Sequence, residues 1–297
     1  MPGTGTSPRA GFVGLGAMGL PMARNLHRHG LLAATWNRSP EKAAALAAET
    51  GVPAAGSLAE LAASCDVVVT CVSADQDLLD VLEALLPGLR PGAVVVDCST
   101  VAAGTAREAA RRLAASGAGF LDCPVSGGTE GARAGTLSIM VGGEPEVLAR
   151  ARPVLEAMGG SITHMGPAGA GQAAKATNQV MVAGINQAVT EALAFGRAQG
   201  LPMDELIAAL ESGAAGNWFL SKRGRTMIRG EFPLGFKVGL HAKDLEICRR
   251  MAGELGVKLP LVEMTLAHYA RLPAESADED ISALFRLKSD MFPGSDD

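Results

Sequence analysis

Short apolar, β-branched runs alternate with Ala- and Leu-rich stretches through the first half of the chain. The apolar runs predict strands at Gly11–Val13, Ala33–Trp36, Val67–Val72, Val94–Asp97, Phe120–Asp122, Leu137–Val141 and Ile162–His164. Helical patterns lie between them, among them Glu41–Glu49, Leu78–Leu86 and Ala106–Ala115. This alternation is typical of βαβ units, so the first half is predicted to form an α/β domain with a mainly parallel sheet.

The pattern changes near Gly166, and the strand signal almost vanishes beyond it. The stretch Gln172–Gln199 reads as one long helix that ends at Gly200 and Pro202. Further helical stretches are predicted at Met203–Glu211, Leu240–Leu255 and Leu261–Ala270. The sequence therefore predicts a domain at residues 1–166 and an all-α second domain at residues 167–297.

Composition and charge exclude several classes of protein. Of the 297 residues, 48% are apolar and 19% are charged, which is a globular composition. The net charge of −5, with no long basic run, argues against general nucleic-acid binding. No apolar run is long enough to cross a bilayer, so no membrane association is expected. The N-terminal stretch Met1–Arg9 lacks an apolar signal core, which favours a cytoplasmic protein.

Neither the cysteines nor the histidines predict a metal site. The chain has 5 cysteines, an odd number, and no Cys-x-x-Cys spacing, so buried reduced thiols are expected. The histidines do not pair with a carboxylate at a metal-binding spacing. We therefore expect no metal ion.

A glycine-rich motif follows the first predicted strand and opens a helix. It consists of Gly14, Leu15, Gly16, Ala17, Met18 and Gly19. In such a motif the first glycine permits a tight turn, the second lets the backbone approach a pyrophosphate, and the third lets helix and strand pack closely. The helix N-terminus then offers N–H groups to the phosphates. The motif predicts dinucleotide binding on a Rossmann-type, doubly wound sheet.

The end of the second predicted strand indicates which dinucleotide binds. NAD sites usually carry Asp or Glu there, which accepts hydrogen bonds from the ribose. This chain has Asn37, followed by Arg38 and Ser39. Asn removes a charge that would repel a 2′-phosphate, and Arg offers a planar fork to bind it. The sequence favours NADP, although NAD remains possible and a solvated surface Arg is the plainer interpretation. Ser39 followed by Pro40 is also a good helix start.

Four segments in order resemble the β-hydroxyacid dehydrogenase family, which includes 3-hydroxyisobutyrate dehydrogenase and the tartronate and succinic semialdehyde reductases. They are the glycine-rich motif, Asp122–Gly128 continuing to Gly135–Leu137, Gly169–Asn178 and Lys243–Leu245. The resemblance runs from about Gly11 to about Leu287. It implies an oxidoreductase that transfers a hydride between NADP(H) and a small 3-hydroxy acid or the matching semialdehyde.

The resemblance also implies roles for individual residues. Ser126, Gly127 and Gly128 correspond to the segment that binds the substrate carboxylate, and paired glycines let N–H groups converge on an anion. Lys175 corresponds to the catalytic lysine, which stabilises charge on the carbonyl oxygen and exchanges its proton. Asn178 corresponds to a residue that holds lysine and substrate. Taken without the resemblance, a lysine in this apolar stretch would be interpreted as snorkelling to solvent.

Other candidates are assigned to the cofactor. Lys243 corresponds to a family lysine that reaches the cofactor and substrate cleft, and Val72, Ser99 and Thr100 lie at the ends of strands on the side where doubly wound sheets bind ligands. Gln179 departs from the Asn often found there. His241 attracts attention because it lies close to Lys243, and Trp218, Phe219 and Phe236 could line a substrate pocket or belong to the core.

Two rival functions remain as alternatives, namely an imine reductase and a non-catalytic NADP-binding protein. Imine reductases usually lack the lysine matching Lys175, and a non-catalytic protein would be expected to have a damaged set of site residues. The substrate is expected to be a small carboxylate, but the Asp278–Phe285 segment resembles semialdehyde reductases while Ser126–Gly128 fits several members equally well. The long apolar helix from Gln172 also predicts a homodimer or homotetramer.

Overall fold

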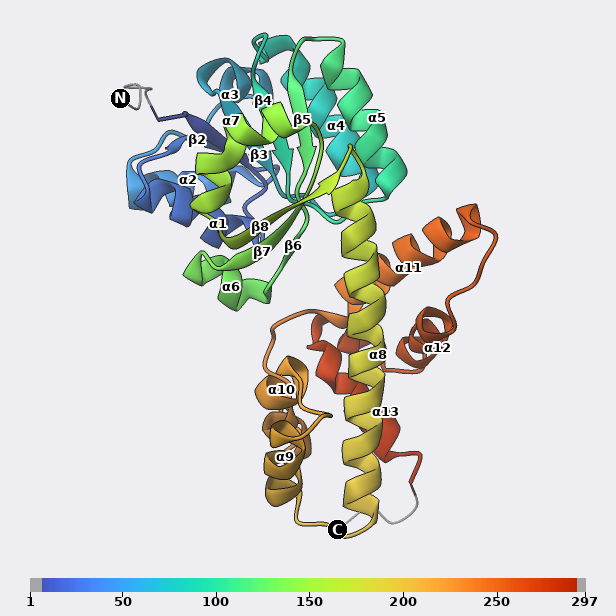
Figure 1. Ribbon diagram of the computed structural model, residues 1–297. Coiled ribbons are helices and arrows are strands. Elements are labelled where there is room, and N and C mark those ends of the chain that lie inside the picture. Colours follow the sequence, from blue (N-terminus) through green and yellow to red (C-terminus); the bar gives the residue numbers. More distant parts are fainter. Residues whose placement is uncertain (1–6, 293–297) are drawn as a thin grey trace. The chain divides into compact units, whose positions relative to one another are not determined.

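The computed structural model describes residues 7–292, which divide into two compact units between Lys175 and Ala176. The first unit is built on an 8-stranded sheet (Figure 1). Its strands are β1 (Ala10–Val13), β2 (Leu32–Trp36), β3 (Val67–Thr70), β4 (Val94–Asp97), β5 (Gly119–Asp122), β6 (Val125–Ser126), β7 (Leu137–Gly142) and β8 (Gly159–Gly166). The first five strands pair in parallel in the order β2-β1-β3-β4-β5, and β7 joins β5 antiparallel.

Helices cover both faces of this sheet. They are α1 (Gly19–Arg28), α2 (Pro40–Thr50), α3 (Leu58–Ser64), α4 (Asp75–Leu85), α5 (Ala103–Ala114), α6 (Gly128–Ala134) and α7 (Pro145–Glu156). Successive strand side chains point to opposite faces, so Val67 and Val69 join a core with α1, α2 and α7. Val68 between them joins a second core with α3, α4 and α5. The doubly wound, mainly parallel α/β fold predicted from the sequence is confirmed.

The order of the strands places a switch point beside the glycine-rich motif. The chain pairs β2 on one side of β1 and then β3 on the other side. In open α/β sheets, ligands bind beyond the carboxyl ends of the strands at such a point. The segment that follows Val13 therefore lies where the fold favours a ligand.

The long helix α8 (Ala170–Ala198) contains the point where the two units divide. Beyond it the second unit contains α9 (Met203–Ser212), α10 (Trp218–Ile228), α11 (Val238–Glu254), α12 (Pro260–Tyr269) and α13 (Leu284–Ser289). Their apolar faces meet in one core, which includes Leu193, Phe219, Leu245 and Phe285. The long helix expected at Gln172–Gln199 is present, beginning and ending within two residues of that range.

Some local expectations differ from the structure. The third strand ends at Thr70, so Cys71 and Val72 belong to the loop after it. Helix α2 begins at Pro40 as predicted, but the Ser39 side chain makes no capping hydrogen bond. Within residues 7–292 no helix is both long and apolar enough to span a membrane. Most of the N-terminal stretch Met1–Arg9 lies outside the described residues.

Candidate functional site

The three glycines of the motif have three different environments. Gly14 has φ +95°, and a Cβ there would overlap the Cys71 carbonyl oxygen after β3. A Cβ on Gly19 would overlap the Gly14 carbonyl oxygen, so this glycine is needed where α1 meets the loop. A Cβ on Gly16 would meet nothing within 4 Å. The open space at Gly16, beside the start of α1, is the arrangement that lets a pyrophosphate approach the backbone.

Asn37 fixes the glycine-rich loop to the end of β2. Its Oδ1 accepts a hydrogen bond from the Leu15 N–H at 2.7 Å, and its Nδ2 donates to the Ser39 carbonyl at 2.9 Å. Leu15 is itself buried in the core beside α1. The side chain therefore joins the loop after β1 to the loop after β2 without adding a negative charge there.

Two cations stand next to this loop. Arg38 is 83% exposed at its side chain, and its Nη1 lies 3.1 Å from Asp77 Oδ1 in the first turn of α4. Lys42 lines a hollow together with Gly16 and Ala17. Sequence reasoning selected Arg38 but missed Lys42, because a lysine near a helix start carries no signal until the hollow beside it is known.

A buried hydrogen-bond network joins the carboxyl ends of β3 and β4. Asp97 Oδ1 accepts from Thr70 Oγ1 at 2.8 Å and from Ser99 Oγ at 2.6 Å. The Ser99 hydroxyl also accepts from the Val72 N–H at 2.8 Å. Burial raises the pKa of the Asp97 carboxyl to about 6. Ser99 and Val72 thus hold the strand ends in place, and Thr100 follows, half-buried.

Lys175 lies next to the predicted carboxylate-binding segment. The residue is only 7% exposed, and its Nζ donates a hydrogen bond to the Val125 carbonyl at 2.9 Å. Ser126 follows directly and is half-exposed. Gly127 and Gly128 both have positive φ, +130° and +61°, which side chains rarely adopt. The structure therefore brings the predicted lysine to the strand that leads into the predicted anion-binding glycines.

Within the second unit, the other helix residues form a chain of polar contacts. Asn178 Nδ2 donates to Gln179 Oε1 at 2.7 Å, and Gln179 Nε2 donates to Asp244 Oδ2 at 2.8 Å. Lys243 Nζ lies 3.0 Å from Asp244 Oδ1. Gln179 and Asp244 are buried, whereas Asn178 and Lys243 are half-exposed. Gln179 therefore connects the predicted residues of α8 with those of α11.

His241 belongs to a buried cluster rather than to a surface. Its Nδ1 lies 2.8 Å from the Tyr269 hydroxyl, which also accepts from Asn186 Nδ2 at 3.0 Å. The Phe236 ring packs 5.4 Å from the imidazole. Of the two alternatives left open for these rings, the core is excluded for Trp218, which is 55% exposed, whereas Phe219 is buried in the core. Among the described residues no group of three or more potential ligands is arranged to hold a metal ion.

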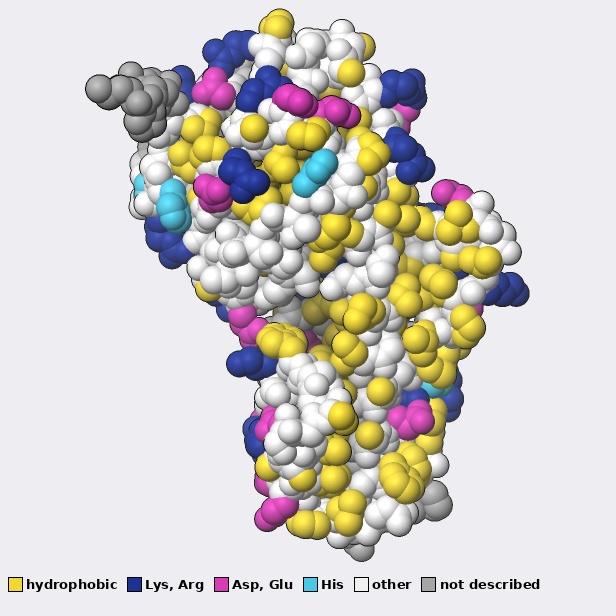
Figure 2. All heavy atoms as spheres, viewed as in Figure 1, with side chains coloured by type: hydrophobic (Ala, Val, Ile, Leu, Met, Phe, Trp, Pro, Cys, Tyr) yellow, Lys and Arg dark blue, Asp and Glu magenta, His cyan; other side chains and the backbone are white. Residues whose placement is uncertain are grey.

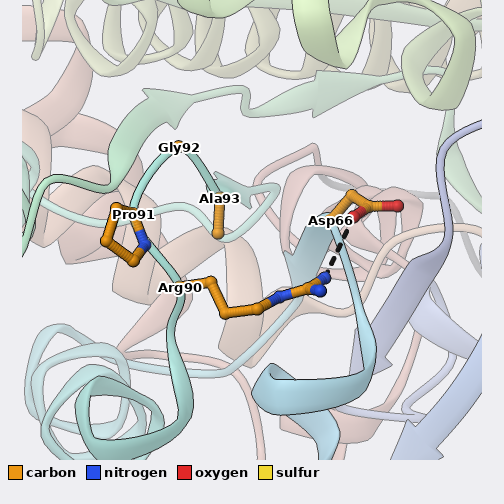
Figure 3. Close-up of a pocket in the computed structure, with 5 residues that line it drawn as sticks. All are labelled: Asp66, Arg90, Pro91, Gly92 and Ala93. Carbon is orange, nitrogen blue, oxygen red and sulfur yellow. Dashed lines mark hydrogen bonds and ion pairs between the residues drawn. The ribbon is translucent and has the colours of Figure 1, made fainter.

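A separate hollow lies at the amino ends of β3 and β4 (Figure 3). It is lined by Asp66, Pro91, Gly92, Ala93 and Arg90, whose guanidinium lies 3.0 Å from the Asp66 carboxylate. These residues precede β3 and β4, whereas the glycine-rich loop follows β1. The hollow contains none of the predicted site residues.

Comparisons with known proteins cover nearly the whole chain. The family model described as the NAD-binding domain of 6-phosphogluconate dehydrogenase matches residues 9–166. The model described as NAD-binding of NADP-dependent 3-hydroxyisobutyrate dehydrogenase matches residues 169–288. Among curated relatives, the NAD-dependent L-serine dehydrogenase of Pseudomonas aeruginosa is 36% identical over 287 residues, which is 93% of this chain and 96% of that protein.

Solved structures match over similar lengths. The 3-hydroxyisobutyrate dehydrogenase of Mycobacterium tuberculosis, described with L-serine, is 34% identical with a TM-score of 0.87, covering 95% of this chain and 99% of that one. A structure described as Psf3 in complex with NADP+ and 2-OPP is 28% identical with a TM-score of 0.85, covering 94% and 99%. One relative is thus named for NAD and one structure contains NADP+.

Proposed function

This chain belongs to the β-hydroxyacid dehydrogenase family, and from that premise we propose that it interconverts a small 3-hydroxy acid and its semialdehyde with NADP(H). The members of this family are nicotinamide-dependent oxidoreductases that act on hydroxy acids. The observation that carries the proposal is the placement of Lys175. A nearly buried lysine donates to Val125 O, and that residue is followed at once by Ser126–Gly128.

The side chains around Lys175 suit proton transfer at a carbonyl oxygen. In the reductive direction the ammonium stabilises the negative charge that develops on that oxygen and then donates its proton. In the oxidative direction the neutral amine accepts the hydroxyl proton. Ser126, Gly127 and Gly128 hold the substrate carboxylate, and Asn178 orients the reacting group. The bound nicotinamide supplies or accepts the hydride. No metal ion is part of this proposal, because the lysine provides the positive charge.

We assign the cofactor as NADP on the charges near the ribose. Asn37 leaves no carboxylate at the end of β2, and its oxygen is already used by the Leu15 N–H. Arg38 is exposed and able to turn toward a 2′-phosphate. Lys42 lines the hollow beside Gly16 and adds a second positive charge. These three side chains favour NADP over NAD.

The class of substrate is proposed from the predicted carboxylate-binding segment and from the names of the relatives. The names of the relatives include L-serine and 3-hydroxyisobutyrate. Both are small acids with a hydroxyl on the carbon β to the carboxylate. A screen of 3-hydroxyisobutyrate, L-serine, tartronate semialdehyde and succinic semialdehyde with both cofactors tests the proposal. Reduction of a cyclic imine but of no semialdehyde would favour an imine reductase, and no turnover at all would favour a binding protein.

We also propose that the chain forms a homodimer or homotetramer through the helical unit. Large apolar side chains are exposed there, including Met181, Phe195, Leu240, Leu261 and Met264. Figure 2 shows hydrophobic atoms gathered over α8, α11 and α12. Monomeric proteins rarely expose so much apolar surface to water. Because most soluble oligomers are symmetric assemblies of identical chains, a second copy of this chain is the partner that covers it.

A further inference from the structure

The Asp122 carboxylate, at the end of β5, holds the start of α8. Its Oδ1 accepts a hydrogen bond from the Gly169 N–H at 2.8 Å, and its Oδ2 accepts from the Gln172 N–H at 2.9 Å. Gly169 precedes the helix and has no side chain to cap it. Asp122 therefore caps the N-terminus of α8 from the end of β5, and its negative charge lies at the positive end of the helix dipole.

The packing around this cap is close, and it depends on two glycines. Asp122 is fully buried, and a Cβ on Gly142 in β7 would overlap its carboxylate. A Cβ on Gly171 would lie 2.5 Å from the carbonyl oxygens of Asp122 and Met140. Burial raises the pKa of the Asp122 carboxyl, and the hydrogen bonds that it accepts from backbone N–H groups oppose this rise. The first turn of α8 is thus seated directly on β5 and β7.

Gln172 provides a second connection in the same turn of the helix. Its Nε2 donates to the Ser99 carbonyl at 2.8 Å, and its Oε1 accepts from the Val101 N–H at 3.2 Å. The side chain is 1% exposed. Since Ser99 is itself held by Asp97, the helix start is tied to the end of β4 as well as to β5.

These contacts determine where Lys175 lies. Lys175 comes three residues after Gln172, about 4.5 Å farther along the helix axis and on the same side. Its Nζ contacts Val125, which comes three residues after Asp122. One short segment, Asp122–Gly128, therefore caps the helix at one end and carries the lysine's acceptor and the proposed carboxylate site at the other.

We propose that Asp122, assisted by Gln172, is a positioning residue that sets the height of α8 and so places Lys175 Nζ beside Ser126–Gly128. The inference rests on the proposed catalytic role of Lys175. Asp122 is buried and acts through the helix rather than by touching the substrate. Because a displacement of about 1 Å can lower the rate roughly 10²-fold, a weakened cap is expected to appear in kcat.

The variant Asp122→Asn keeps the shape of the side chain but removes one acceptor. Its amide nitrogen would face the N–H of Gly169 or Gln172, so one of the two hydrogen bonds is lost and two donors meet. We expect kcat to fall about 10- to 100-fold. The Kd for NADPH is expected to stay within about threefold, because the glycine-rich loop is untouched.

A double-mutant cycle separates positioning from general destabilisation. Asp122→Asn, Lys175→Ala and the double variant are compared by single-turnover rate, NADPH Kd, melting temperature and the pH dependence of the rate. If Asp122 acts through Lys175, its substitution changes the rate of the Lys175→Ala protein by no more than about twofold. It also displaces the pH profile when Lys175 is present. Additive effects of the two substitutions on the rate, or an Asp122→Asn variant with nearly normal kcat, would overturn the inference.

Leu113→Ala is the matched control, because Leu113 is fully buried in α5 and packs in the core of the opposite sheet face. It should lower the melting temperature with kcat unchanged, and an equal fall in kcat at equal destabilisation would refute positioning. If Asp122→Asn does not fold, Gln172→Met replaces it in the same cycle, since it removes the ties to Ser99 and Val101 only. Lys175→Ala with high activity would defeat the proposed function itself, whereas an inactive Lys175→Ala with additive effects defeats only the positioning role.

Discussion

Replacing Arg38 by alanine is expected to weaken NADPH use while leaving NADH use and stability almost unchanged. The guanidinium lies 3.1 Å from the Asp77 carboxylate, but its side chain is 83% exposed. An exposed ion pair of this kind contributes about 0–1 kcal/mol, so the free energy of unfolding should hardly change. The loss should appear in the binding of the 2′-phosphate instead.

The size of that loss follows from the type of contact. A hydrogen bond to a charged group contributes about 1.5–3 kcal/mol, which corresponds to roughly a 10- to 150-fold change in affinity. Asp77 competes with the phosphate for the same guanidinium, so the effect in this chain is expected near the lower end. For the same reason Asp77→Asn should strengthen NADPH binding by a few fold, about 1 kcal/mol or less.

The assay is a titration of both reduced cofactors by fluorescence, together with kcat/KM for each, at low and at high salt. Arg38→Ala should raise the Kd for NADPH about tenfold or more and leave that for NADH within about twofold. Asp77→Asn serves as the matched control, because it removes the opposite member of the same pair. Equal effects of Arg38→Ala on both cofactors, or no effect on either, would refute a contact with the 2′-phosphate.

Three further outcomes are expected. Asp97 has a pKa raised to about 6, so its protonated form stabilises the fold below that pH, and about 3 kcal/mol is lost as pH rises from about 4 to 6. Chemical denaturation should show that the free energy of unfolding of the wild type declines over that pH range, and that Asp97→Asn removes most of this decline. An unchanged pH dependence in the variant would contradict the assignment. Gly14→Ala, which places a Cβ against Cys71 O at φ +95°, should abolish cofactor binding and lower the melting temperature, as calorimetry would show. Light scattering should give a dimer or tetramer mass at micromolar concentration, and a monomer mass would contradict the proposed interface.

The strands and the long helix could be predicted from the sequence because their patterns are local. Burial on both faces of the sheet produces the continuous valine runs of β3 and β4, and α8 is rich in alanine. The patterns did not indicate α3, α6, α10, α13 or β6. Helix α3 has only 7 residues and β6 only 2, which is too short for a periodic signal to stand out.

The site divides along the same line. The glycine motif was recognisable as a short sequence pattern, Arg38 was selected by its place after the second strand, and Lys175 was selected only through the family resemblance. The contacts that place Lys175 were not recognisable, because Asp122 meets the N–H groups of Gly169 and Gln172 across 47 and 50 residues of chain. Those contacts depend on β5 ending next to the start of α8. The sequence thus indicates the reacting groups, and the structure shows what holds them.

The central claim is that Lys175 exchanges the proton at the substrate's carbonyl oxygen, and the single-turnover rate of Lys175→Ala tests it most directly. Loss of general acid catalysis is expected to lower that rate by about 10²–10⁴-fold. Binding of NADPH and the far-UV circular dichroism spectrum should be unchanged, and Lys175→Arg should not restore the rate, because guanidinium is a poor proton donor. A folded Lys175→Ala protein that binds NADPH and keeps more than about a tenth of the wild-type rate would contradict the claim.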